Sequence, residues 1–173
     1  MWTVRLAPPE IETGAENCAD IGVDSVWVQN LSHDFGDASA ESRYRRLQEY
    51  VGEEALFQPG DGRGAEAFDL AARRAREVGL PLRLPRLVQR PDRRGDHEPG
   101  CSWPWDSAYV THRGEVQPCC MVMGSDRATL GNLQTERFPE IWRGEVYRDF
   151  RERLLGDDPP DVCRGCSLYR GLF

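Results

Sequence analysis

The distribution of six cysteines constrains the fold of this 173-residue chain more than any other feature of its sequence. Cys18 is the only cysteine before residue 101, and we expect it to be a small apolar core residue of a helix. The remaining five lie in the last 73 residues, at Cys101, Cys119, Cys120, Cys163 and Cys166. Residues 1–10 lack the basic, apolar and small-residue succession of a secretion signal, so we expect a cytoplasmic protein. Cytoplasmic cysteines more often bind metal than form disulfides, which predicts a metal site in the C-terminal part.

Two of these cysteines form a local pair, in the run Cys163-Arg164-Gly165-Cys166. The Cys-x2-Cys spacing lets two thiolates point to one centre, because a tight turn leaves backbone amides free to bond to sulfur. Two further ligands can come from Cys101 and from a cysteine at the end of a predicted hairpin. With Cys119 as that ligand, the full spacing is Cys-x17-Cys-x43-Cys-x2-Cys. This spacing suits either an iron–sulfur cluster or a zinc ion that staples a small interaction module.

The predicted hairpin consists of two short extended runs, 107–111 and 115–119, with Gly114 at the turn between them. Neighbouring residues of a strand point to opposite faces. If Cys119 is a ligand, Cys120 is therefore expected to be a small buried residue on the opposite face.

Two helical segments are expected after the hairpin. A helical turn is predicted over residues 138–142, where a proline begins it, and a longer helix over residues 144–155. The inward-facing residues of the longer helix are predicted to be Val146, Phe150 and Leu154.

Residues 1–88 show the alternation of helices and strands that is typical of parallel α/β folds. A first helix is expected to end at Gly22, as a glycine cap. The run 23–30 then has the β-favouring composition of a strand buried on both faces. Two amphipathic helices and a second strand follow, over residues 41–51, 65–78 and 80–88, and Gly79 is expected to close the second of these helices. Residues 89–100 carry proline, glycine and charge but nothing to bury, which predicts a linker.

The composition argues against two classes of protein. All 22 basic residues are arginine, 29 residues are acidic and the net charge is −7, which disfavours binding to nucleic acid. No apolar run approaches the roughly 20 residues that cross a bilayer, so no membrane span is expected.

The order of motifs after residue 100 resembles that of radical SAM enzymes with a C-terminal auxiliary-cluster domain of the SPASM or Twitch type. The resemblance begins at Cys101-Ser102-Trp103-Pro104-Trp105 and ends at Cys163 and Cys166. Residues 22–33 look like a late barrel strand of the same enzymes. The intervening motifs are Gly114-Glu115-Val116-Gln117-Pro118-Cys119-Cys120, Leu130-Gly131-Asn132-Leu133 and Glu140-Ile141-Trp142.

The resemblance implies an α/β chain in three parts. Residues 1–88 would be a partial (β/α) barrel, 89–100 a linker, and 101–173 a small α+β auxiliary-cluster domain of a hairpin plus a helix. The one-cluster Twitch form fits better than the two-cluster SPASM form, which needs more cysteines than the five available here. Such a cluster relays electrons or positions substrate in the radical modification of a peptide or small metabolite. The implied ligands of one auxiliary [4Fe-4S] cluster are Cys101, Cys119, Cys163 and Cys166.

One departure from the family limits what the chain can do. The Cys-x3-Cys-x2-Cys motif, which holds the cluster that binds S-adenosylmethionine, is absent from these 173 residues. We therefore expect the C-terminal portion of a radical SAM oxidoreductase, a split subunit or truncated gene that is inactive alone. S-adenosylmethionine would bind only to a complete enzyme. The expected partner is an upstream radical SAM half or a peptide substrate.

The sequence identifies no catalytic residue. His33 follows a predicted barrel strand, and the C-terminal ends of such strands host active sites. We expect His33 either to contact a substrate or cofactor there or to lie in a solvated loop.

Overall fold

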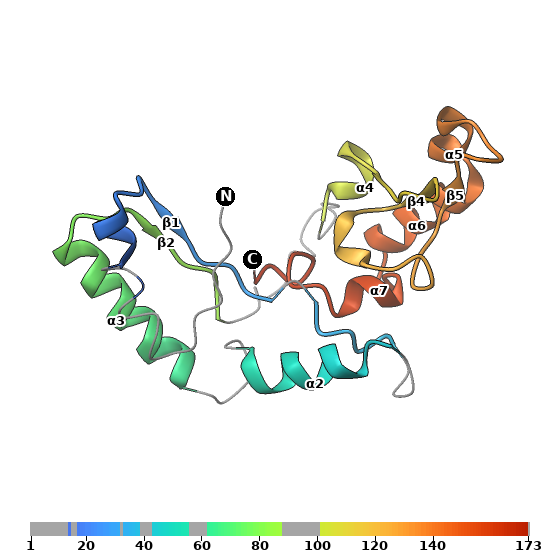
Figure 1. Cartoon of the computed structure of the whole chain (residues 1–173). Coiled ribbons are helices and arrows are strands. Elements are labelled where there is room, and N and C mark those ends of the chain that lie inside the picture. The colour runs from blue at the N-terminus through green and yellow to red at the C-terminus, as the bar shows by residue number, and fades with distance from the viewer. Residues whose placement is uncertain are drawn as a thin grey trace.

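The structure is a computed structural model that describes residues 14, 17–31, 33–38, 43–55, 62–87 and 101–172. It mixes helices with two small sheets, which agrees with an α/β chain, and the expected linker 89–100 lies outside the described residues. Figure 1 shows β1, β2 and α3 at one end of the molecule and the elements after residue 100 at the other. In chain order the elements are β1 (Val26–Trp27), α2 (Arg45–Glu54), α3 (Arg63–Glu77), β2 (Leu82–Arg83), α4 (Trp103–Asp106), β3 (Tyr109–Val110), β4 (Glu115–Gln117), η1 (Cys120–Val122), β5 (Gly131–Asn132), α5 (Phe138–Arg143), α6 (Glu145–Leu155) and α7 (Asp161–Arg164).

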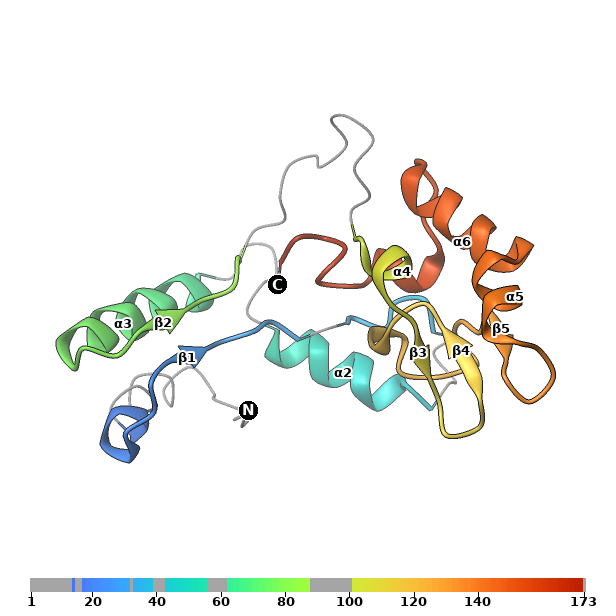
Figure 2. The ribbon, with the colours of Figure 1, turned by 90° about the horizontal axis from the view of Figure 1, so that it is seen from above.

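The first sheet consists of β1 and β2, which pair in parallel beside α3 (Figure 2). Leu82 of β2 packs against Ala67 and Ala71 of α3, so one face of the pair is covered. The prediction that the first strand is buried on both faces is wrong, because the side chain of Trp27 is 64% exposed. Trp27 points to the face opposite α3, where the Arg83 guanidinium lies 4.8 Å from its ring centroid. Two parallel strands with helices between them are compatible with the expected barrel remnant, which stays a prediction.

Glycines end two helices of the first part, as the sequence predicts. Residues 17–21 are helical, and Gly22 follows with a φ of 80°. The backbone N–H of Val23 donates to the carbonyl of Cys18, 3.2 Å away, which closes the last turn. Gly79 takes the same left-handed conformation after α3, with a φ of 69°. Cys18 is half-buried on its helix.

The second sheet is antiparallel, in the order β3, β4, β5. Its first two strands form the predicted hairpin, and Gly114 has a φ of 78° at the turn. The sequence did not predict the third strand, which places Gly131 opposite Val116. A Cβ at Gly131 would lie 2.7 Å from the side chain of Ile141, so glycine lets α5 pack onto this strand.

Helix α6 covers the second sheet with a stripe that differs from the predicted one. Phe150 and Leu154 are buried as expected, but Val146 is 57% exposed and Tyr147 is buried in its place. The buried stripe therefore runs i, i+3, i+7 from Tyr147. Only its first position differs from the prediction, by one residue. The core around it consists of Val116, Val122, Leu130, Ile141, Tyr147, Phe150, Leu154 and Val162.

The segment after β1 joins the two parts of the molecule. The Asn30 side-chain amide donates to the carbonyls of Arg86 and Leu172, at 2.7 and 2.6 Å. His33 forms a β-bridge with Cys166, and Leu172 packs into a second core with Phe35, beneath α2. The C-terminal residues therefore lie along residues 30, 31 and 33–35, and the bridge places His33 beside Cys166. The red C-terminal segment and the blue segment after β1 run close together in Figures 1 and 2. Among the helices that the structure describes, none is long and apolar enough to cross a membrane.

Candidate metal centre

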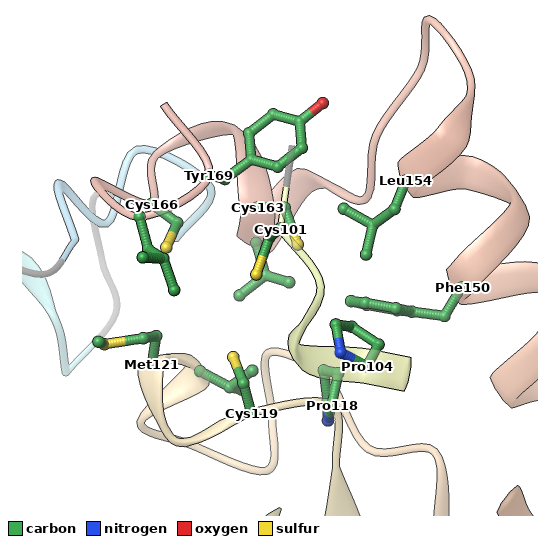
Figure 3. Close-up of a pocket in the computed structure, with 13 residues that line it drawn as sticks. Cys101, Pro104, Pro118, Cys119, Met121, Phe150, Leu154, Cys163, Cys166 and Tyr169 are labelled. Carbon is green, nitrogen blue, oxygen red and sulfur yellow. The ribbon is translucent and has the colours of Figure 1, made fainter. Parts of the chain in front are cut away.

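Four cysteines from three separate segments line one pocket (Figure 3). They are Cys101, Cys119, Cys163 and Cys166, the four predicted ligands. The empty space between the lining side chains is about 390 Å³, which includes the part open to solvent. The other lining residues are almost all apolar and come mainly from η1, α6 and the C-terminal segment: Pro104, Pro118, Met121, Val122, Phe150, Leu154, Val162, Leu168 and Tyr169.

Local structure brings each cysteine to the pocket. Cys101 lies two residues before α4, and Cys119 precedes η1 in an extended conformation with a φ of −165°. Cys163 lies within α7, where its N–H donates to the carbonyl of Pro160 at 2.8 Å. The N–H of Cys166 donates back to the carbonyl of Cys163 at 3.1 Å, so the Cys-x2-Cys run forms the expected tight turn.

The four cysteine side chains face a common space. All four cysteines are free thiols, and Figure 3 shows the Cys119 side chain directed across the pocket toward Cys101. Within the described residues, no three His, Cys, Asp or Glu side chains are placed to hold one metal ion. Tetrahedral zinc, with Zn–S of about 2.3 Å, requires sulfurs roughly 3.8 Å apart. In a cluster each thiolate binds a different iron, so its sulfurs stand farther apart than those around one zinc ion.

Burial keeps the thiols of Cys119, Cys163 and Cys166 protonated in the metal-free chain. Burial raises the pKa of Cys119 to about 12, and neighbouring cysteines add to the effect. Burial also raises the pKa of Cys163 and of Cys166. A thiolate in this apolar space is stable only when a cation compensates its charge, as a metal ion or cluster does. The donor set therefore fits a thiolate-bound metal group, while ligation by these four residues stays a prediction.

The predicted burial of Cys120 is wrong, because Cys120 is exposed. The strand β4 ends at Gln117, and the chain turns into η1 at Cys120. The alternation of a strand therefore does not extend to the Cys119-Cys120 pair. Cys120 still points away from the pocket, but toward solvent rather than into a core.

His33 does not lie in a solvated loop, because its side chain is fully buried behind Cys166. Its Nε2 lies 2.5 Å from the carbonyl of Val162, and its Nδ1 accepts a hydrogen bond from the N–H of Phe35 at 2.8 Å. These partners assign the neutral tautomer with hydrogen on Nε2. Burial lowers the pKa of His33, which agrees with a neutral ring. His33 therefore supports the backbone just before Cys163.

An ion pair beside His33 was not predicted from the sequence. Both Arg127 and Asp37 are almost fully buried, with side chains 3% and 7% exposed. Asp37 accepts two hydrogen bonds from Arg127, at 2.9 Å from Nε and 2.5 Å from Nη2. The two residues are 90 positions apart, so no local pattern could have paired them.

Comparisons with known proteins identify the domain around the pocket. Residues 101–167 match the SPASM family, described as an iron–sulfur cluster-binding domain. The chain is 34% identical over 108 residues to an AdoMet-dependent heme synthase of Oleidesulfovibrio alaskensis, covering 57% of this chain and 25% of that protein. It is 38% identical over 74 residues to an AdoMet-dependent heme synthase of Nitratidesulfovibrio vulgaris, covering 39% of this chain and 19% of that protein. The chain thus spans about a quarter or less of the curated relatives it matches. No solved structure matches it significantly.

Proposed function

We propose that this chain, which is a SPASM-containing radical SAM C-terminal portion, holds one auxiliary [4Fe-4S] cluster. The ligands would be the thiolates of Cys101, Cys119, Cys163 and Cys166. The observation that carries the proposal is the convergence of these four thiols on one apolar pocket inside the matched domain. When bound, such a cluster supplies one-electron redox chemistry.

The protein's own residues shield the proposed cluster. Phe150 and Leu154 of α6 and Tyr169 of the C-terminal segment form an apolar wall around the thiols (Figure 3). Solvent access and the polarity of the surroundings control the potential of a metal centre. These side chains therefore support a cluster that stays bound and is tuned by the protein.

The cysteine count supports one cluster rather than two, as in the Twitch arrangement. Four of the five C-terminal cysteines line the pocket, and the fifth, Cys120, is exposed. Cys18 lies in the helical residues 17–21, the dark blue segment at the end of the molecule opposite α4–α7 in Figure 1. Neither Cys18 nor Cys120 is placed to complete a second cluster.

The cluster would relay an electron or position the substrate of a radical reaction. The chain lacks the Cys-x3-Cys-x2-Cys motif, so binding and cleavage of S-adenosylmethionine would belong to a complete enzyme or an upstream radical SAM half. Both curated relatives are AdoMet-dependent heme synthases, which favours a small metabolite over a peptide as the substrate class.

Metal and sulfide analysis of anaerobically purified protein tests the proposal. We expect about four iron and four sulfide per chain, and an EPR signal of the reduced cluster after addition of dithionite. Cys18→Ala serves as the control and should keep the same iron content. Stoichiometric zinc without sulfide would overturn the cluster and favour a zinc-stapled module.

A further inference from the structure

A buried ion pair lies beside the proposed cluster pocket. It consists of Arg127 and Asp37, and both side chains are less than a tenth exposed. Removing two charges from water costs several kcal/mol per ion, so such a pair is a weak source of stability. Its position beside the cysteines points to a further role.

The Arg127 side chain contacts the backbone of the segment that carries Cys119. Its Nη1 donates to the carbonyl of Val122, 2.8 Å away. Val122 ends η1, which follows Cys119, and its side chain lines the pocket. Arg127 therefore fixes the loop that carries Cys119.

Arg127 also contacts His33, which lies against the turn that carries Cys163 and Cys166. Its Nη2 lies against the His33 ring, 3.2 Å from Nδ1 and 2.9 Å from Nε2, as a packing contact, because both ring nitrogens already have backbone partners. His33 contacts the carbonyl of Val162 and forms the bridge with Cys166, so its ring lies against the turn that carries Cys163 and Cys166. One guanidinium thus ties together two segments that are distant in the sequence.

We propose that Arg127 is a positioning residue for the cluster and that the Arg127–Asp37 pair sets its reduction potential. The inference depends on the proposed function, because it requires a cluster between the cysteines. The potential of such a cluster depends on net charge, hydrogen bonding and solvent exposure. A fixed buried cation stabilises the reduced cluster, which carries one more electron, and the carboxylate of Asp37 offsets part of that effect.

Both charges of the pair lie close to His33, which forms the bridge with Cys166. Arg127 contacts Val122 through Nη1, whereas Asp37 accepts from Nε and Nη2, and its Oδ1 lies 4.0 Å from Nε2 of His33. Removing Asp37 would leave an unbalanced cation, and removing Arg127 would take away the stabilising charge.

A redox titration of the anaerobically reconstituted full chain tests the inference. Iron and sulfide content are measured first, and the cluster signal is then followed by EPR against dithionite. We expect Asp37→Asn to raise the potential and Arg127→Gln to lower it. Each change should alter the reduction equilibrium at least about threefold, which is about 30 mV for one electron.

Two further variants separate charge from packing. Arg127→Lys keeps the charge and should keep the potential close to that of the native chain, even if the melting temperature falls. Asp126→Asn removes the neighbouring exposed pair of Asp126 with Arg43 and should leave the potential unchanged. Shifts in the same direction for Asp37→Asn and Arg127→Gln, or shifts no larger than that of Asp126→Asn, would overturn the inference.

The outcomes also distinguish this inference from the proposed function. A native chain that binds zinc without sulfide contradicts the proposed function. A native chain that holds a cluster whose potential does not respond to Asp37→Asn contradicts only the inference. If Arg127→Gln retains no iron, the inference is tested by Asp37→Asn alone, and a reduction potential that does not rise in that variant contradicts it.

Discussion

Gly165 and Asp34 are in direct contact, although 131 positions separate them in the sequence. The N–H of Asp34 donates to the carbonyl of Gly165 at 3.0 Å. A Cβ at position 165 would lie 1.9 Å from Oδ1 and 2.7 Å from Cγ of Asp34. The φ of Gly165 is −88°, which any residue adopts, so glycine is needed here for space and not for conformation. The Cys-x2-Cys turn therefore packs against the first part of the chain.

Gly165→Ala is expected to weaken this packing. The added methyl group must displace the Asp34 carboxylate and the buried His33 ring, whose Cε1 would lie 2.9 Å away, and such overpacking typically costs about 1–3 kcal/mol. We expect a melting temperature several degrees lower, since about 1 kcal/mol shifts it by roughly 2–4 °C in a chain of this size. Gly156→Ala is the matched control, because its Cβ would lie 3.6 Å from the nearest atom. Equal melting temperatures of the two variants would contradict the close contact.

Replacing adjacent cysteines should have opposite effects on metal content. Cys119→Ala removes a thiol that lines the pocket, so we expect most of the iron to be lost. Cys120→Ala removes an exposed thiol and should leave the iron content unchanged. Iron and sulfide analysis of the two purified variants measures the difference. Loss of iron only in Cys120→Ala would show that Cys120, and not Cys119, is the ligand.

Adjacent residues of α6 should differ sharply in their contribution to stability. Tyr147 is fully buried and its ring lies 4.8 Å from that of Trp142, so Tyr147→Ala should lower the free energy of unfolding by about 3–5 kcal/mol. Val146 is exposed, and Val146→Ala should change the free energy of unfolding by no more than about 0.5 kcal/mol. Chemical denaturation followed by circular dichroism compares them. A larger effect at Val146 would restore the stripe predicted from the sequence.

Iron retention should rise with pH. Burial raises the pKa of Cys119 to about 12, so its metal-free thiol is protonated throughout the neutral range. Metal release therefore takes up protons, and the apparent affinity should rise about tenfold per pH unit for each proton exchanged. We expect a chelator to remove more iron at pH 6 than at pH 8.5. Retention that is flat or falls with pH would show that the ligating thiols are not protonated on release.

The chain alone is not expected to cleave S-adenosylmethionine. Cleavage in this family requires three thiolates that leave one iron open, and Cys18 is the only cysteine before residue 101. We expect no methionine to be released when the reconstituted chain is incubated with S-adenosylmethionine and dithionite. Reductant-dependent release of methionine, measured by chromatography, would contradict this expectation.

The amino-acid sequence determined the features that depend on local order. The glycine caps at Gly22 and Gly79, the hairpin turn at Gly114 and the helices α2 and α3 follow from short-range patterns of backbone freedom and side-chain periodicity. The spacing of the cysteines singled out the four thiols that the fold gathers in one pocket, because hairpins and tight turns bring ligands together predictably.

Only the tertiary structure decided which faces are covered and which charges are buried. Trp27 is exposed and Tyr147 replaces Val146 in the core, because burial depends on the element that packs opposite and not on the residue's own helix or strand. The Arg127–Asp37 pair is sequestered for the same reason. Its partners come from segments 90 residues apart, and local periodicity carries no information about a contact that forms only when the two parts of the chain dock.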